Sequence, residues 1–341
     1  MAKPLPLHAD LIQYQHAVAG HDGTLCDVNG ELFIKPCTAA EIAFYEASVA
    51  SHPQFAEYMP TYLGTLTLDA DQEVTSFEDA SAALIAKHTI PEVVVPPKNN
   101  KQTKKIATSQ ALVLENAAHG FVKPNIMDTK LGIRLWADDA HPDKKTRFDK
   151  ITEETTHKTF GFRVAGMRVW QGHGASGQDV DEDGYKIFDK DYGKVFIGNH
   201  NVKEAFRNFI FAESAGIDKE LGRLVAQALL TDVMRIQDVL ENQESRMFSS
   251  SLLFVFEGDG AALRSAMEEA SRSPPTLANG DESTSGSSED GDELEPAGPK
   301  IYAVNVIDFA HAEWTPGMGP DENSLTGVRS VVKILRELAA E

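Results

Sequence analysis

The chain has 341 residues, of which 42% are hydrophobic, and it carries a formal net charge of -20 at pH 7. This length and composition predict one large or two modest globular domains with a sizeable core. The negative charge argues against direct binding of nucleic acid and against general binding to anionic membranes, because both require a basic surface.

The sequence also lacks the usual marks of secretion and membrane insertion. No apolar run reaches the length of a membrane span, and residues 1–10 lack the basic-then-apolar layout of a signal peptide. The two cysteines, Cys26 and Cys37, are too few for a disulfide framework or a structural zinc site. We therefore expect an intracellular protein, nuclear, cytoplasmic or both.

The N-terminal part predicts short strands followed by a helix. The turn dipeptides Asp22-Gly23 and Asn29-Gly30 indicate hairpins, with a strand over residues 31–35. Thr38 and Glu41 form a capping-box pattern at the start of a helix. Taken alone, Lys35 is a solvated strand end, and the capping box would occupy the Glu41 carboxylate.

The next segments predict a loop and a strand. Residues 95–105 are polar and basic without periodicity, which is typical of a mobile loop. Residues 107–115 form an apolar, strand-like run that stops at Glu115 and Asn116. The small residues that follow, 117–120, predict a compact and flexible connection.

The string from Pro124 to Gly132 brings a carboxylate and an ammonium group together. Asp128 and Lys130 are two residues apart, so on an extended segment both side chains leave from the same face. Phosphoryl transfer needs such a pair, a base for the attacking hydroxyl and a fixed positive charge on the moving phosphate. An exposed turn that carries a surface ion pair is the alternative interpretation.

A short helix is predicted after this string, over residues 142–155. Lys144, Arg147 and Lys150 lie about one turn apart and would make one face of the helix basic. The interspersed Asp143 and Asp149 also fit an ordinary solvent-exposed helix.

The rest of the chain alternates strands and helices around one polar insertion. Apolar patterns predict strands over residues 161–170, 248–257 and 301–309, and helices over 202–211, 217–241 and 325–338. Residues 172–184 predict a loop, and the acidic, Ser- and Gly-rich residues 271–300 predict a disordered insertion. The apolar run from Ile301 to Ile307 ends at Asp308, whose carboxylate could hold magnesium.

Three ordered motifs resemble the signature set of the inositol polyphosphate kinase family. They are P-x-x-x-D-x-K-x-G from Pro124 to Gly132, S-S-L-L-F at 250–254 and I-D-F-A-H at 307–311. The resemblance implies an α+β, two-lobed, kinase-like fold. Residues 1–115 would form an N-lobe built on an antiparallel sheet, and residues 116–341 a larger α+β C-lobe with the inositol-binding helix and the insertion. The P-loop and protein-kinase motifs are absent from the sequence.

The resemblance also implies roles for particular residues. Asp128 would orient or deprotonate the inositol hydroxyl, and Lys130 would stabilise the transferred phosphoryl group. Asp308 would bind Mg²⁺. The implied ATP-binding residues are Lys35, Glu41, Glu115, Asn116, Ala117, Asp128 and Asp308. The implied substrate-binding residues are Lys130, Lys144, Arg147, Lys150, Lys190 and His311, and for His311 a satisfied loop or core histidine is the alternative.

Within the family, the sequence is most like a fungal inositol polyphosphate multikinase. About thirty residues separate Gly132 from Gly161, which leaves room for a short helix and its connections. The resemblance implies a larger helical insert at this place in inositol trisphosphate 3-kinases, so the short interval favours a multikinase. We expect ATP and Mg²⁺ as cofactors and inositol tris- and tetrakisphosphates as substrates, with phosphatidylinositol bisphosphate headgroups as a further class. The alternatives are an inositol hexakisphosphate kinase and a non-catalytic scaffold whose partners are components of a transcription or signalling complex.

Overall fold

The computed structural model describes residues 11–18, 23–67, 108, 110–175, 177, 179–272 and 300–341. The predictions for residues 95–105 and 273–299 lie outside the described residues. Ser271 and Arg272 are described, and they form the last turn of helix α7 (Gly260–Arg272) instead of the start of the insertion. Among the described residues, no helix is long and apolar enough to cross a membrane.

An antiparallel sheet of five strands forms the N-lobe. Its strands are β1 (Leu11–Gln13), β2 (Leu25–Asp27), β3 (Leu32–Pro36), β4 (Tyr62–Thr67) and β5 (Gln110–Glu115), in the order β1-β2-β3-β5-β4. Helix α1 (Ala39–Ser51) follows β3, and the Thr38 side chain accepts a hydrogen bond from the backbone N–H of Glu41. A short helix, α2 (Pro53–Ala56), leads into β4. The predicted strand and helix are therefore both present.

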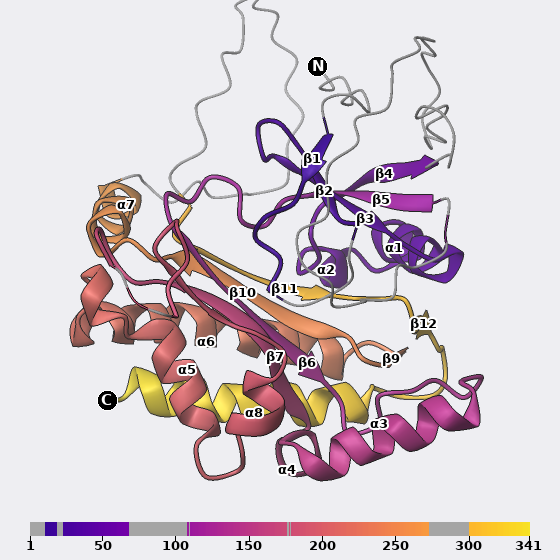
Figure 1. Cartoon of the computed structure of the whole chain (residues 1–341). Helices are drawn as coiled ribbons and strands as arrows, with labels where there is room; N and C mark the ends of the chain where they lie inside the picture. The colour runs from indigo at the N-terminus through magenta and orange to yellow at the C-terminus, as the bar shows by residue number, and fades with distance from the viewer. Residues whose placement is uncertain are drawn as a thin grey trace, which may run out of the picture.

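A second antiparallel sheet of five strands forms the centre of the C-lobe. Its strands are β6 (Pro124–Leu131), β7 (Phe162–Trp170), β8 (Tyr185–Phe188), β10 (Ser251–Glu257) and β11 (Tyr302–Ile307), in the order β11-β10-β6-β7-β8. The short strands β9 (Ser245–Met247) and β12 (Ala312–Trp314) pair with each other beside it. The C-lobe sheet lies between the N-lobe and the long helices (Figure 1).

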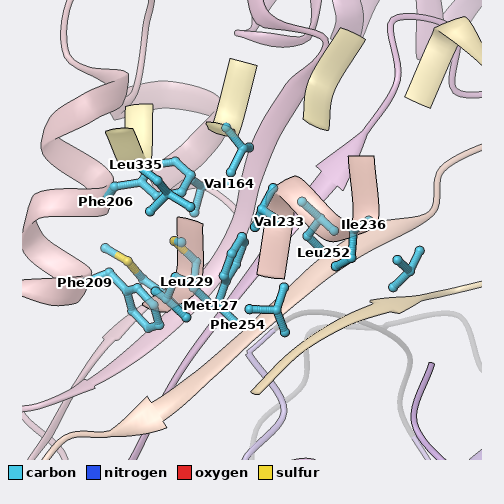
Figure 2. Packing of buried hydrophobic residues seen from close by; sticks show 14 of the residues in the cluster. Met127, Val164, Phe206, Phe209, Leu229, Val233, Ile236, Leu252, Phe254 and Leu335 are labelled. Atoms are coloured by element: carbon cyan, nitrogen blue, oxygen red, sulfur yellow. The ribbon is translucent and has the colours of Figure 1, made fainter. Parts of the chain in front are cut away.

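Helices cover the face of the C-lobe sheet that points away from the N-lobe (Figure 1). They are α5 (Val202–Ile210), α6 (Lys219–Glu241) and α8 (Glu322–Ala339). Figure 2 shows Met127, Leu252 and Phe254 of the sheet packed among side chains of these helices. All three side chains are fully buried. The sheet is thus fixed from one side, and its other face remains available to the N-lobe.

Four further helical segments in the described part of the chain connect strands of the C-lobe. They are α3 (Pro142–Glu154), α4 (His157–Phe160), a π-helix η2 (Tyr192–Phe196) and a 3-10 turn η3 (Glu213–Ala215). Helix α3 fills the predicted range 142–155 almost completely and begins at a proline, a favourable first residue for a helix.

Strand β6 separates the core from the site because its side chains alternate between the two faces of the sheet. Met127 and Leu131 are buried in the hydrophobic core, so Asp128 and Lys130 leave from the opposite face. Across the sheet, Lys130 pairs with Ser251 of β10 and Arg163 of β7, and Asp128 pairs with Leu253 and Gly166.

Strand β7 contains a β-bulge beside Asp128. The register shifts between the pairs Asp128–Gly166 and Thr129–Val164, so one extra residue, Ala165, lies on β7. The bulge changes the direction of β7 beside Asp128 without disturbing the alternation along β6.

Candidate active site

Three side chains from two distant parts of the chain meet between the lobes. The ammonium group of Lys35 lies 2.7 Å from Glu41 Oε1 and 2.8 Å from Asp308 Oδ1. The same Glu41 oxygen accepts a hydrogen bond of 3.1 Å from the backbone N–H of Phe309. Glu41 therefore connects α1, β3 and the end of β11, and its carboxylate is not confined to its own helix cap.

Lys35 is a permanently charged group in this setting. Desolvation alone would lower its pKa, but the carboxylates of Asp308 and Glu41 outweigh the desolvation and hold the pKa of Lys35 above its usual range. The side chain is only 15% exposed, so its charge acts with little screening by solvent. Lys35 is thus not the solvated strand end that the bare sequence allows.

Asp308 lies directly after β11 in an unusual backbone conformation. Its φ angle is 67°, in the left-handed region that residues other than glycine rarely adopt. Such strain is concentrated at functional sites, where the surrounding structure holds it in place. Lys130 Nζ lies 3.5 Å from Asp308 Oδ2 and donates a 2.8 Å hydrogen bond to the carbonyl of Ser249, which also has a positive φ of 62°.

Asp128 is a buried carboxylate whose hydrogen bonding is incomplete. Its side chain is buried, and Oδ1 has no hydrogen-bond partner among the described residues. Burial raises the pKa of Asp128, with a further increase from Asp308, while the Lys130 charge lowers it. An unsatisfied buried carboxylate oxygen is expensive, so it marks a position that a ligand group completes.

An interlobe cavity leads to these charged groups. Its apolar walls include Phe33 and Leu114 of the N-lobe sheet and Leu253 and Val255 of β10. Lys35, Asp128 and Asp308 also line the cavity, as do residues 115–118. A concave, mostly apolar site with a few convergent polar groups is typical of cofactor binding.

The segment between the lobes is held by several hydrogen bonds. The backbone N–H groups of Glu115 and Asn116 donate to the carbonyls of Thr61 and Glu31. Lys300 Nζ lies 2.9 Å from Glu115 Oε1. Although burial raises the pKa of Glu115, the hydrogen bonds from Lys300 and Thr61 outweigh it and hold that pKa below its usual range. Residues 115–117 thus line the cavity as a fixed wall.

Of the predicted substrate-binding residues, Lys144 and His311 lie close together. Lys144 Nζ and His311 Nε2 are 3.0 Å apart, which connects α3 to the loop after β11. His311 is exposed and not a core residue. Partial desolvation of the ring at the edge of the site lowers the pKa of His311, and the Lys144 charge lowers it further.

Lys130, also predicted to bind substrate, lies in the site described above, whereas three other predicted residues contact their own segment or face solvent. Arg147 packs against the ring of Phe148, Lys150 lies 3.7 Å from Glu154 on its own helix, and Lys190 is exposed before η2. Their predicted contact with substrate remains a prediction.

Arg163 is a site residue that the sequence analysis missed. It lies opposite Lys130 on β7, is buried, and is close enough for its charge to lower the pKa of Asp128. Burial lowers the pKa of Lys194, and Arg163 adds to the effect. In the sequence Arg163 fits the apolar–polar alternation of this strand, which predicts a solvent-facing side chain, whereas every residue of β7 is buried in the structure.

The residues present suit a divalent metal held together with a nucleotide. Asp308 and Asp128 offer carboxylate oxygens on the same side of the C-lobe sheet. Among the described residues, no group of three or more His, Cys, Asp or Glu side chains could hold a metal by itself. Magnesium is commonly held by one or two carboxylates plus the phosphates of a nucleotide, which fits this donor set.

The fold and the site define a phosphotransferase of the kinase-like, two-lobed class. A lysine–glutamate pair of the N-lobe meets the Asp308 carboxylate of the C-lobe at an interlobe cavity that Asp128 also lines. The family model for inositol polyphosphate kinase matches residues 111–336, and the chain belongs to this family.

Individual relatives agree with this assignment. The inositol polyphosphate multikinase of Saccharomyces cerevisiae is 31% identical over 94% of this chain and 96% of its own length. Human inositol hexakisphosphate kinase 1 is 30% identical, over 67% of this chain and 53% of its own length. The crystal structure of S. cerevisiae Ipk2 with ADP and Mn²⁺ aligns with 90% of this chain and 99% of its own at a TM-score of 0.60 and 27% identity. The predicted α+β, kinase-like fold is confirmed.

Proposed function

We propose that this protein is an ATP-dependent inositol polyphosphate multikinase that phosphorylates inositol tris- and tetrakisphosphates. The observation that carries the proposal is the convergence of Lys35, Lys130 and Asp308 beside Asp128, whose Oδ1 has no hydrogen-bond partner among the described residues. Similarity to the yeast multikinase along nearly the whole chain supports the multikinase activity, whereas the similarity to the hexakisphosphate kinase extends over two thirds of the chain.

The N-lobe residues bind the nucleotide in this mechanism. Lys35 contacts the ATP phosphates, and Glu41 holds its ammonium group in place through their 2.7 Å contact. The apolar walls and residues 115–117 receive the base. Asp308, with Asp128 near it, would hold the divalent metal. The metal, Mg²⁺ in our proposal, would neutralise phosphate charge during the transfer.

The C-lobe residues act on the acceptor. Asp128 orients the inositol hydroxyl and accepts its proton at Oδ1, the oxygen without a partner in the described part of the chain. Its raised pKa makes it a better proton acceptor than an ordinary aspartate. Lys130 places a positive charge beside the transferred phosphoryl group, and Lys144 and His311 provide cationic and hydrogen-bonding groups at the edge of the site.

A substrate panel tests the proposal. Purified protein is supplied with ATP, Mg²⁺ and, separately, inositol tris-, tetrakis- or hexakisphosphate, or vesicles that contain phosphatidylinositol bisphosphate. We expect turnover of the tris- and tetrakisphosphates, and product analysis gives the ring positions. Turnover of the hexakisphosphate alone would support the alternative enzyme, an inositol hexakisphosphate kinase. Turnover of none, with intact fold, would support a scaffold function.

A further inference from the structure

The described start of the loop between β1 and β2, residues 14–18, forms one wall of the interlobe cavity. The backbone N–H of Tyr14 donates to the carbonyl of Thr24 and closes the base of this loop. Tyr14, His16, Ala17 and Val18 all line the cavity, together with the charged groups and residues 115–118. The described part of the loop, residues 14–18, therefore covers the proposed nucleotide site from the N-lobe side.

A guanidinium group of the C-lobe holds the described part of the loop through hydrogen bonds. Arg168 of β7 donates from Nη1 to the carbonyl of Gln15 at 3.1 Å and contacts His16 Nδ1 at 2.9 Å. Arg168 is buried, and the mechanism above gives it no role. A guanidinium has only donors, so His16 Nδ1 must accept this hydrogen bond, which requires a neutral ring.

Arg168 is itself held in position from the C-lobe. Its guanidinium lies 3.8 Å from the ring centre of Tyr185, and Nη2 lies 3.6 Å from carboxylate oxygens of Asp181 and Asp183. These contacts with C-lobe residues fix the orientation of the Arg168 guanidinium, which donates to the loop. The loop, by contrast, follows a strand of only three residues at the edge of the N-lobe sheet.

A second contact, between Val18 and Gly166, independently shows that the loop lies against β7. A Cβ atom placed on Gly166 would lie 2.2 Å from the carbonyl oxygen of Val18. Only glycine allows the loop to lie this close to β7, and Gly166 pairs with Asp128. The loop therefore lies against the strand beside the proposed catalytic carboxylate.

We propose that Arg168 is a positioning residue for the nucleotide, which holds residues 14–18 against the C-lobe so that they form the outer wall of the ATP site. This inference rests on the proposed function. Arg168 contacts neither Asp128 nor Lys130 in the structure, so its loss should weaken nucleotide binding and leave the transfer step of bound nucleotide nearly unchanged. The effect should therefore be on KM for ATP and not on kcat.

The main test compares Arg168→Met with a matched control, Arg246→Met. Arg246 also donates to backbone carbonyls, those of Ser245, Met318 and Gly319, but does not line the cavity. We expect Arg168→Met to raise the ATP KM and the ADP dissociation constant about tenfold, with kcat and the KM for inositol phosphate within about twofold. An equal effect of Arg246→Met, or a fall in kcat alone, would overturn the proposal.

Variants of His16 test the contact from the loop side, where folding is less at risk. His16→Asn keeps a hydrogen-bond acceptor near the position of Nδ1, and His16→Leu removes it. We expect nearly wild-type ADP binding for the asparagine variant and about tenfold weaker binding for the leucine variant. Equal binding by both variants would contradict the role of Arg168. If the unmodified protein failed to bind ADP at all, the proposed function itself would fall and this inference with it.

Discussion

At the scale of single residues, Asp128 shows how a stability cost can accompany a proposed catalytic role. The carboxylate is buried, one of its oxygens has no partner among the described residues, and its pKa is raised by burial. Each of these features disfavours the folded state, because a buried charge without full hydrogen bonding is expensive. Each also favours acceptance of a proton from a bound hydroxyl.

Asp128→Asn should separate the two effects. The amide cannot accept the proton, so we expect kcat to fall by a factor of about 10² or more. The unfolding free energy should stay the same or rise, since a neutral group replaces a desolvated charge. Steady-state kinetics and urea unfolding of the same preparation measure both quantities. A loss of stability together with unchanged kcat would contradict the assigned role.

His157 should make the protein sensitive to acid. The residue is fully buried, its Nδ1 is 2.7 Å from the carbonyl of Gly132, and burial lowers its pKa from 6.5 to about 3, with a further contribution from the Arg163 charge. Between those values the unfolded state binds a proton that the folded state does not, so stability is complete above pH 6.5 and falls as the pH decreases toward 3. At pH 5 the loss from this group is about 2 kcal/mol.

The variant His157→Asn tests this prediction. The asparagine amide can still donate to Gly132 but does not titrate. We expect the unfolding free energy of the variant to be lower at neutral pH but to decrease less between pH 7 and pH 5. Denaturant unfolding at several pH values measures the two slopes, and parallel slopes would show that another group controls the acid response.

The sequence identified some residues of the site and missed others for a physical reason. Spacing along one strand gives the shared face of Asp128 and Lys130, and the end of an apolar run gives Asp308. Arg163 and Arg168 act through pairing with other segments, a contact that depends on register and cannot be read from local sequence. The meeting of Lys35 with Asp308 was expected only through the family resemblance.

At the scale of secondary structure, close contact between α8 and the start of β7 fixes the core helix against the C-lobe sheet. Gly327 of α8 packs on Gly161, and a Cβ atom on Gly327 would lie 2.3 Å from the Gly161 carbonyl oxygen and 2.9 Å from Leu131. Gly161 has a φ of 66°, the conformation that ends α4. The helix and the strand can meet here only without side chains.

Gly327→Ala should therefore destabilise the protein in spite of the higher helix propensity of alanine. The propensity gain is about 1 kcal/mol, but overpacking against backbone costs about 1 to 3 kcal/mol and cannot be relieved by a rotamer change. We expect a net loss of unfolding free energy, measured by urea denaturation. Lys333→Ala on the exposed face of α8 is the control and should change stability by less than about 0.5 kcal/mol. A stabilised Gly327→Ala variant would contradict the packing argument.

Strongly patterned elements were predictable, and those that depend on tertiary contact were not. The apolar stripes of α6 and α8 and the strand β6 follow from periodicity. Helix α7 buries only Gly260, Leu263 and Ala266, so few apolar positions mark it, and the sequence predicts its last two residues as part of the insertion. The π-helix η2 depends on Gly193, whose Cβ would lie 1.9 Å from the Val164 carbonyl oxygen. Local sequence does not report such a contact.

At the scale of the whole molecule, α1 belongs to the N-lobe in sequence but packs on the C-lobe through aromatic rings. Trp314 of β12 stacks on Phe44 at 5.1 Å and on His52 at 3.5 Å between ring centres, and its indole N–H donates to Ser48. Phe309 joins the same group, 4.8 Å from Phe44. One hydrophobic cluster includes residues of both lobes.

The two lobes should therefore unfold together. We expect a single calorimetric transition in which the calorimetric and van't Hoff enthalpies agree. Trp314→Ala should lower the unfolding free energy by about 3 kcal/mol and lower the melting temperature of the transition without dividing it. Scanning calorimetry of both proteins gives the comparison, and two resolved transitions in the unmodified protein would show that the lobes are independent.

The distance along the chain between Lys35 and Asp308 also has a consequence for biosynthesis. The two residues are 273 positions apart, whereas Lys35 and Glu41 are only six apart. At about 5 to 20 residues per second, a ribosome needs about 14 to 55 s to add Asp308 after Lys35. During that interval Lys35 can pair with Glu41 but not with Asp308. Chains released before position 308 would carry the motif from Pro124 to Gly132 but would lack the Asp308 carboxylate that lies beside Lys130.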